Sequence, residues 1–144
     1  LTGIVLAAAG VKRLGYSEAV TQFLPTEIML PAVGQGALGL QVRKSDAELA
    51  GLCARLNHAV TEAEVTAERA YLRALGGGCR LPIAAYGLME GKRLTLEGLL
   101  AAPNGGEVLR DKVWGEPGDA EAMGRKLAEM ILEKGGRRLL ELMG

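Results

Sequence analysis

The sequence predicts a chain of class α/β plus α+β, with a small α+β domain over residues 58–144 and pieces of α/β structure over residues 1–57. After residue 58, a long helical pattern is followed by three strand patterns with short turns and then by a second long helical pattern. This order can bury one face of a three-stranded antiparallel sheet under helices on that face. Residues 1–57 hold only short strand and helix patterns, which do not close into a domain of their own.

Composition excludes several classes of protein. Apolar residues make up 49% of the 144 residues and aromatic residues only 3%, so we expect an aliphatic core rich in alanine. Lys+Arg and Asp+Glu balance at 17 each, so no net field attracts nucleic acid or an anionic membrane. No apolar run reaches membrane-spanning length. The two cysteines form neither a disulfide framework nor a zinc-ligand spacing, which predicts reduced thiols, a cytoplasmic location and no metal.

The first expected elements are a short buried strand at residues 4–7 and a helical turn at residues 8–14, which Gly15 ends. Lys12 and Arg13 fall at the end of this turn, and two interpretations stay open. These cations either complement the negative end of the helix dipole or bind a carboxylate, for which the forked guanidinium of Arg13 is suited.

A short helix at residues 18–23, an extended segment at residues 26–30 and a glycine-rich turn that becomes a strand at residues 32–43 are expected next. The turn Gly34-Gln35-Gly36 lacks the full spacing of a dinucleotide or phosphate-binding motif, so a hinge or a close backbone crossing fits it better. Gln35 either aims its amide into a cleft or is a buried structural glutamine.

A helix over residues 46–56 is expected to face Leu49 and Leu52 inward, with Cys53 as a small core residue beside them. His58 lacks the partners of a catalytic histidine. The next helix is expected from a capping box at Thr61 to about residue 75, with Glu68 on its polar side. Three strands are then expected at residues 83–89, 93–101 and 107–114. Two helices are expected after them, at residues 119–135 and 137–143.

The loop at residues 76–82, GGGCRLP, uses three glycines and a proline to place one cysteine between a helix and a strand. Cys79 follows a helix C-terminus, where the helix dipole disfavours a thiolate. No Cys–His arrangement is present to activate it. The residues therefore indicate either a thiol that reacts once and stays modified, or a buried and inert loop cysteine.

Four stretches, in the same order along the chain, resemble the hydroxymethylbilane synthase family, also called porphobilinogen deaminase. They are LAAAGVKRLG at residues 6–15, LPAVGQGALG at residues 30–39, VTAERA at residues 65–70 and GGCRLPI at residues 77–83. The last stretch resembles the family's cofactor-attachment loop. Separated motifs in one register are far more specific than any one of them, and the similarity covers nearly the whole chain.

The resemblance implies three domains: two α/β domains resembling periplasmic binding proteins, and a small C-terminal α+β domain. By this correspondence, residues 1–30 are the C-terminal part of domain two. Residues 31–57 hold the hinge, near Pro31 to Gly36, and the return strand and helix of domain one. Residues 58–144 are the cofactor-bearing domain. Because the chain begins within a strand pattern and without methionine, we expect a fragment of a longer protein.

The resemblance also implies a transferase of porphyrin and heme biosynthesis. The family condenses four porphobilinogen molecules, with loss of ammonia, into the linear tetrapyrrole hydroxymethylbilane, and it primes on a dipyrromethane cofactor. Cys79 matches the cysteine that holds this cofactor through a thioether. Arg13 matches an arginine that binds the acetate and propionate side chains, and Ala7 lies in a turn that resembles cleft backbone. Gln35 and Gly36 match positions near the domain crossing and are candidates for the substrate cleft.

The family's catalytic aspartate lies in its N-terminal half. The resemblance therefore implies that this chain carries no catalytic residue and acts with that half, in a complete enzyme that is monomeric. Two other classes stay open. One is a stand-alone α+β ligand-binding or interaction domain with an inert loop cysteine. The other is a thiol redox module, which the lack of a nearby resolving cysteine disfavours.

Overall fold

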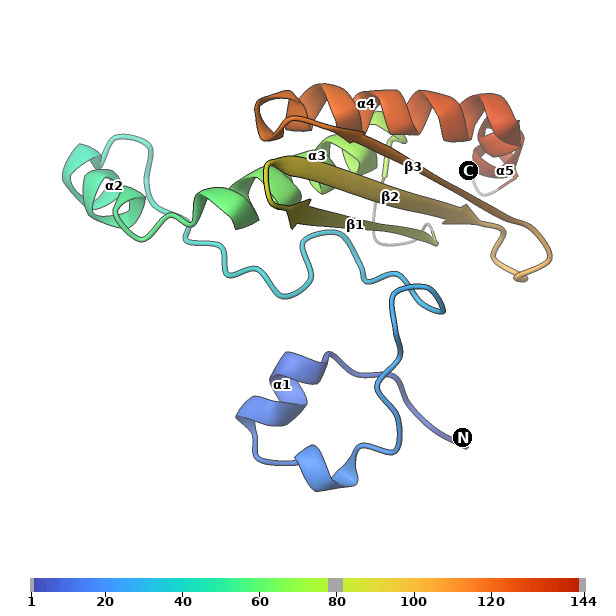
Figure 1. Cartoon of the computed structure of the whole chain (residues 1–144), viewed down its shortest axis with the longest axis horizontal. Helices are drawn as coiled ribbons and strands as arrows, with labels where there is room; N and C mark the ends of the chain where they lie inside the picture. The colour runs from blue at the N-terminus through green and yellow to red at the C-terminus, as the bar shows by residue number, and fades with distance from the viewer. Residues whose placement is uncertain (1, 78–81, 143–144) are drawn as a thin grey trace.

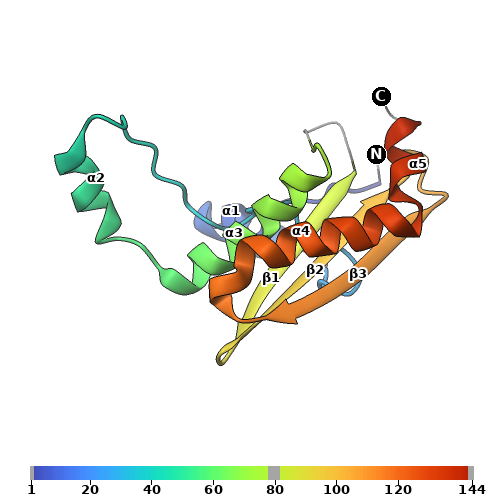
Figure 2. The ribbon, with the colours of Figure 1, turned by 90° about the horizontal axis from the view of Figure 1, so that it is seen from above.

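The C-terminal part of the chain is a two-layer α+β unit, seen in a computed structural model that describes residues 2–77 and 82–142. Helix α3 (Ala59–Ala74) is followed by strands β1 (Ile83–Glu90), β2 (Arg93–Ala101) and β3 (Val108–Gly115) and by helix α4 (Ala120–Ile131). The strands form an antiparallel sheet in the order β1-β2-β3. Both helices lie on one face of this sheet, as Figure 1 and Figure 2 show. The predicted α+β unit is therefore confirmed.

The core lies between the sheet and the two helices, and it is mainly aliphatic, as predicted. Leu94, Leu96 and Leu100 of the central strand β2 are fully buried, because alternate residues of a strand point to the same face. Leu127 and Ile131 of α4 pack onto them from the helix layer. Burial of such a side chain contributes about 1.5–3 kcal/mol, so this cluster is a main source of stability.

Tyr71 of α3 is the aromatic member of this core. Its side chain is fully buried, and its hydroxyl group has no hydrogen-bond partner in the part of the chain that the structure describes. Burial raises the pKa of this phenol, because the charged form loses its hydration. Gly98 of β2 leaves room for the ring, since a Cβ there would lie 2.7 Å from the ring carbon Cζ.

Gly124 lets α4 approach α3 closely. A Cβ at this position would lie 2.4 Å from the carbonyl oxygen of Ala67 and 2.6 Å from the Cβ of Ala70. Both distances are far shorter than a van der Waals contact, so the two helices pack with no side chain between them at this point. The contact sets the spacing of the helix layer that covers the sheet.

The C-terminus turns back on itself after α4. A π-type turn, η3 (Leu132–Gly136), precedes the short helix α5 (Arg137–Glu141). Gly135 within this turn has a φ of 119°, a conformation that L side chains rarely adopt. Nζ of Lys134 lies 2.6 Å from Oδ2 of Asp111 in β3. The hydrogen bond from this lysine holds the pKa of the Asp111 carboxyl below its usual range.

Residues 2–57 hold two short helices, α1 (Ala8–Arg13) and α2 (Ala47–Ala54), and a 3-10 turn, η1 (Ser17–Ala19). The strand predicted at residues 4–7 and the one predicted to follow the glycine turn within residues 32–43 are wrong, because neither segment forms a strand in this structure. A strand requires a neighbour that satisfies its backbone groups, and the described residues supply none for either segment.

Two further predictions for the N-terminal part are corrected. The helix expected at residues 18–23 is reduced to η1, and the segment expected to be extended at residues 26–30 contains a turn. In this turn the Ile28 and Met29 amides both donate to the Pro25 carbonyl oxygen, at 3.0 and 3.1 Å. Proline cannot donate a backbone hydrogen bond, but its carbonyl group remains a good acceptor and closes the turn.

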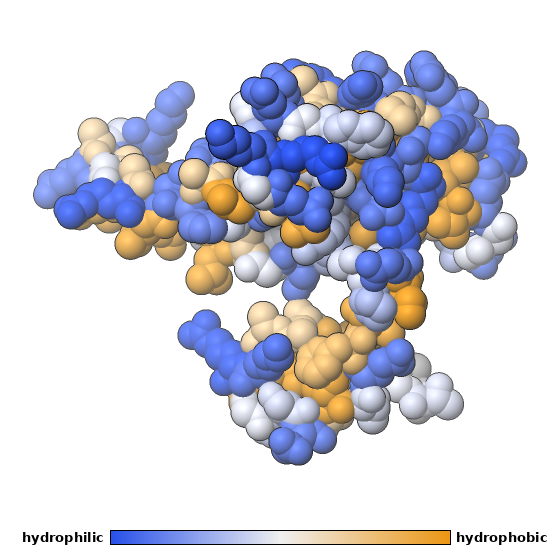
Figure 3. All heavy atoms as spheres, in the orientation of Figure 1, coloured by the Kyte–Doolittle hydropathy of each residue, from blue (hydrophilic) through white to orange (hydrophobic). Residues whose placement is uncertain are grey.

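Many large apolar side chains of residues 2–57 are exposed. Leu49 and Leu52, predicted to face inward, are 43% and 53% exposed, and Cys53 beside them is half-buried. Figure 3 shows apolar surface on the N-terminal part, below the α+β unit. The exposed side chains there include Ile4, Val5, Leu6, Leu14, Tyr16, Phe23, Leu38 and Leu40. Among the helices described, none has the length and apolar character needed to cross a membrane.

Candidate functional site

The predicted cofactor loop begins at the C-terminus of α3. The Gly76 amide donates to the Arg73 carbonyl oxygen at 3.0 Å, and the Gly77 amide donates to that of Leu72 at 2.9 Å. These two bonds form a Schellman motif, in which the residue after the helix cap adopts a left-handed conformation. Gly76 has the required φ of 70°. Two of the consecutive glycines therefore serve to end the helix.

Gly77 has no room for a side chain. A Cβ there would lie 2.8 Å from the Leu72 carbonyl oxygen and 2.3 Å from Cδ1 of the same residue. The path of the chain is therefore fixed as far as Gly77. The predicted cofactor cysteine, Cys79, lies outside the described residues.

We expect Gly76→Ala to lower the free energy of unfolding by about 1–2 kcal/mol, because alanine is strained at positive φ. Gly77→Ala is also expected to destabilise, since its Cβ would meet a backbone oxygen. Gly118→Ala is the matched control, because no atom lies within 4 Å of the added Cβ and the backbone there is unstrained. Chemical denaturation of the three variants measures the effect. Equal stability of Gly76→Ala and the control would contradict the helix-end assignment.

A second group of predicted residues lies on α1. Ala7 flanks the start of this helix, and its carbonyl oxygen accepts from the Gly10 and Val11 amides at 3.1 and 3.2 Å. Arg13, in the last turn, is exposed and forms no ion pair within residues 2–77 and 82–142. The neighbouring Lys12 differs, because its Nζ lies over an aromatic ring in a cation–π contact. Both side chains are exposed, and Arg13 is the one of the two without a cation–π contact in the described residues.

The turn around Gln35 is the third predicted region. Gly34 and Gly36 have φ values of 74° and 87°, and the Gln35 amide donates to the Ala32 carbonyl oxygen at 3.0 Å. Gln35 is exposed, so its interpretation as a buried structural glutamine is wrong. Its place in a glycine turn on the surface explains this, since neither flanking residue has a side chain to cover it.

Glu68 of α3 is a buried residue that the sequence prediction placed incorrectly on a polar face. It is only 6% exposed. Its Oε2 accepts from the Gly34 amide at 2.6 Å, and its Oε1 accepts from the Gly87 amide of β1 at 2.8 Å. Burial raises the pKa of this carboxyl, while the two amide donors oppose the shift by stabilising the ionised form. One carboxylate therefore joins the Gln35 turn, α3 and β1.

The sequence did contain a signal for this burial. Glu64, Glu68 and Tyr71 follow one another at helical spacing, so they share one face of α3. Oε1 of Glu64 accepts from the Met89 amide of β1 at 2.9 Å. β1 passes so close to α3 that a Cβ at Gly87 would lie 2.9 Å from the Glu64 Cα. Because Tyr71 is a core residue, the same periodicity indicates that both glutamates face the sheet.

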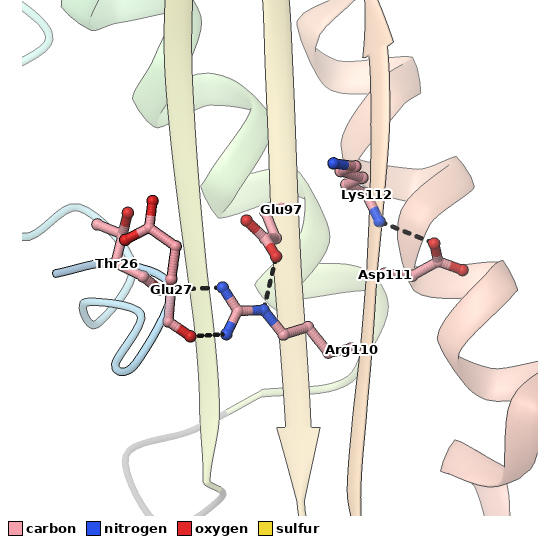
Figure 4. Close-up of polar contacts among 6 residues, drawn as sticks. All are labelled: Thr26, Glu27, Glu97, Arg110, Asp111 and Lys112. Carbon is pink, nitrogen blue, oxygen red and sulfur yellow. Dashed lines mark hydrogen bonds and ion pairs between the residues drawn. The ribbon is translucent and has the colours of Figure 1, made fainter.

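Arg110 of β3 makes a second contact between distant parts of the chain, drawn in Figure 4. Its Nε donates to Oε1 of Glu97 in β2 at 2.6 Å. Its Nη1 and Nη2 donate to the carbonyl oxygens of Glu27 and Thr26, at 2.8 and 2.9 Å. Arg110 and Glu97 lie on the sheet face opposite the helices, so this guanidinium holds the turn of residues 26–28 against that face.

The structure thus joins the Gln35 turn to α3 through Glu68. No hydrogen bond or ion pair within the described ranges joins Arg13 to this turn. Nor does any group of three or more His, Cys, Asp or Glu in these ranges have a geometry that could hold a metal ion.

Two family models match the chain. The one described as porphobilinogen deaminase, dipyromethane cofactor binding domain, matches residues 1–51, and the one described as porphobilinogen deaminase, C-terminal domain, matches residues 62–133. The porphobilinogen deaminases of Syntrophus aciditrophicus and Moorella thermoacetica are each 50% identical over 141 residues, which is 98% of this chain. That of a Nostoc species is 45% identical over 138 residues, or 96% of the chain.

The chain therefore belongs to the porphobilinogen deaminase family, as the four sequence motifs predicted. It spans 46%, 45% and 43% of the lengths of the three relatives named above.

Proposed function

We propose that this chain acts as part of a porphobilinogen deaminase, a transferase that condenses four porphobilinogen molecules into hydroxymethylbilane with loss of ammonia. The observation that carries the proposal is the pair of family matches, which follow one another along the chain and correspond to a cofactor-binding domain and a C-terminal domain. The chain spans less than half of the length of these relatives, and we place the catalytic aspartate in the remaining part of the enzyme.

The proposed cofactor is a dipyrromethane bound to Cys79. Sγ would bond to the methylene carbon of a pyrrole whose aminomethyl C–N bond has broken with loss of ammonia, and the thiol proton would pass to the pyrrole nitrogen of that azafulvene. The bound group would supply the pyrrole carbon from which the product chain is extended. The described residues fit a ligand of this kind, which carries carboxylate side chains. The Arg13 guanidinium is exposed and without an ion-pair partner in residues 2–77 and 82–142. Ala7 is also exposed, and its small side chain leaves space on the surface for a ligand.

Each proposed residue has a distinct role. Arg13 would bind a carboxylate through two parallel hydrogen bonds, which a lysine cannot form. Ala7 would line the cleft with backbone and a methyl group. Gln35 and Gly36 would line the same cleft from the domain crossing, and the exposed amide of Gln35 supports this role. Cys79 need react only once, so it requires no general base.

The remaining part of the enzyme is the proposed partner of residues 2–57. The exposed apolar side chains of this region, among them Val5 and Leu38 at 65% and 94% exposure, support a surface that other chain segments cover. We assign residues 1–30 and 31–57 to the ends of two α/β domains like those of periplasmic binding proteins, and residues 58–144 to the third domain. A monomeric complete enzyme in the cytoplasm is part of the same proposal.

Intact-mass spectrometry of the complete enzyme, made with porphobilinogen available, tests this function. We expect the mass of one dipyrromethane in addition to the polypeptide, and we expect Cys79→Ala to lack it. Cys53→Ala is the matched control and should keep the added mass, since this half-buried cysteine on α2 has no proposed role. An unmodified thiol at Cys79 in the active enzyme would refute covalent attachment. An unmodified and inactive protein would instead support the alternative, a stand-alone binding or interaction domain.

A further inference from the structure

Strand β3 forms an outer edge of the three-stranded sheet. In the part of the chain that the structure describes, β2 is its strand neighbour. Alternate residues of an antiparallel strand direct their backbone groups to opposite sides, so half of the amides and carbonyl oxygens of β3 point away from β2. An edge of this kind is a template on which another strand can pair.

The pairing register identifies the backbone groups of β3 that point outward. The Met89 amide of β1 donates to Oε1 of Glu64 on α3, so Met89 and its register partner Leu94 share no hydrogen bond. Leu94, in the central strand, therefore bonds to its partner in β3, which is Gly115. Every second residue before Gly115 also bonds inward. The outward amides are consequently those of the alternate residues Arg110, Lys112 and Trp114.

The residues of β3 are arranged nearly symmetrically about Asp111. Two apolar residues precede the charged triplet at residues 110–112 and two follow it, in the order VLRDKVW. An antiparallel pair of two β3 strands centred on Asp111 would place Trp114 of each copy opposite Val108 of the other. Because Trp114 and Val108 are 65% and 53% exposed, this contact would bury apolar surface. The ends of the strand therefore favour pairing with a second copy.

The charged triplet opposes the same pairing. In the centred pair, Asp111 of one copy would lie opposite Asp111 of the other, and Arg110 would lie opposite Lys112. Like charges directly opposite each other on neighbouring strands are destabilising. Charged residues on an edge strand, lysine above all, are a common means by which a protein prevents strand addition.

The carboxylate of Asp111 also occupies the middle of the edge. Its Oδ1 accepts from the Lys112 amide at 2.9 Å, which is the bond that a carbonyl oxygen of an added strand would make (Figure 4). Its Oδ2 lies 2.6 Å from Nζ of Lys134, a residue of the turn after α4. Only 19% of the Asp111 side chain is exposed. The carboxylate is therefore held by the lysine while it covers the amide.

The opposite edge of the sheet, on β1, is closed in another way. Helix α3 passes so close to it that a Cβ at Gly87 would lie 2.9 Å from Cα of Glu64. The helix backbone thus stands where an added strand would lie, and the Met89 amide already bonds to Glu64. The β3 edge is the one whose closure depends on side chains.

We propose that Asp111, held by Lys134, keeps the outer edge of β3 closed to the β3 strand of a second copy of the chain. Its carboxylate takes the place of an incoming carbonyl oxygen on the Lys112 amide, and its charge repels Asp111 of the other copy. A strand can pair here only after the carboxylate leaves both the amide and the Lys134 ammonium group. This property belongs to the sheet itself and is independent of the proposed function.

Amide hydrogen exchange, followed by NMR on this chain, tests the contact with the Lys112 amide. We expect Asp111→Ala to speed exchange of this amide about tenfold, after correction for the intrinsic effect of the side chain, because one hydrogen bond is lost. Lys134→Met should speed it about two- to fivefold, the range for an exposed ion pair. The Leu127 amide in the core of α4 should keep its rate. Lys134→Met decides the matter if Asp111→Ala does not fold.

Sedimentation velocity over a range of concentrations tests the closure of the edge. We expect the double variant Asp111→Ala, Lys112→Thr to self-associate with a dissociation constant at least about tenfold lower than that of the unmodified chain. The Arg110 and Trp114 amides of this variant should shift in NMR spectra as the concentration rises, because they lie on the pairing edge.

The double variant Asp119→Ala, Lys126→Thr is the matched control. It makes the same two changes at exposed positions away from the sheet, where the Asp119 side chain caps no amide of α4. The exposed apolar residues of the N-terminal part are common to all these chains, so any association that they cause is the same in each. Association of the Asp111 double variant no stronger than that of this control would overturn the proposal. Equal exchange of the Lys112 amide in the unmodified chain and in Asp111→Ala would overturn it as well.

Discussion

Replacing Gly124 by alanine is expected to lower the free energy of unfolding of the α+β unit by about 1–3 kcal/mol, the range for forcing an extra methyl group into a packed core. The added Cβ would lie 2.4 Å from the Ala67 carbonyl oxygen and 2.7 Å from the Tyr71 backbone nitrogen. These are backbone atoms of α3, so no change of rotamer relieves the overlap. The helices must separate, which would loosen the contacts of Leu127 with the sheet.

Helix propensity acts in the opposite direction and makes the test sharper. Alanine is favoured over glycine within a helix by about 1 kcal/mol, so the steric cost must exceed this gain for the variant to be destabilised. Gly51→Ala is the matched control, because Gly51 lies within the exposed helix α2 with no atom near the added Cβ. It should leave the unfolding of the α+β unit unchanged. A Gly124→Ala chain as stable as this control would show that the close packing of α3 and α4 is not required.

The strands of the α+β unit could be predicted to within a residue or two because their signals are local. Gly91 and Gly105, with φ values of 64° and 70°, form the turns that the sequence marks by glycine. Leu94 and Leu96 alternate with polar residues on β2, which indicates one buried face. The strands expected at residues 4–7 and within residues 32–43 also had local signals, but a strand needs partners as well, and those partners are not among the described residues.

The contacts of residues 26–34 with the α+β unit could not be predicted from local patterns. Arg110 lies 84 residues after Thr26, and its acceptors are backbone carbonyl oxygens, which any residue supplies. Glu68 likewise finds its partners in the backbone of Gly34 and Gly87. A carboxylate on a helix is ordinarily a solvated residue, so exposure was predicted although the spacing of Glu68 and Tyr71 indicates a shared buried face. The cysteine loop was different, because its glycines mark the end of a helix directly.

A chain that begins at Asn57 is expected to fold cooperatively on its own, whereas a chain of residues 2–56 is expected to be unfolded. The hydrophobic core cluster of buried residues runs from Ala67 to Leu139 and includes no buried member from residues 2–56. The piece of residues 57–144 also keeps the start of α3, where Nδ2 of Asn57 donates to Oε2 of Glu62 at 2.6 Å. The N-terminal piece contains one buried large apolar residue, Leu30, among the residues described, and its half-buried Val33 packs against the core of the α+β unit.

The separated α+β unit should be less stable than the same unit in the whole chain. The separated unit loses the apolar contact of Val33 with its core, and Arg110 returns two of its donors to water at little further cost. Circular dichroism and denaturant unfolding of the two pieces, compared with the whole chain, measure both effects. A cooperative transition in residues 2–56 alone would contradict the proposed assignment of this region to domains completed elsewhere. Failure of residues 57–144 to fold would contradict the proposed third domain, because residues 26–34 would then be a required part of its core.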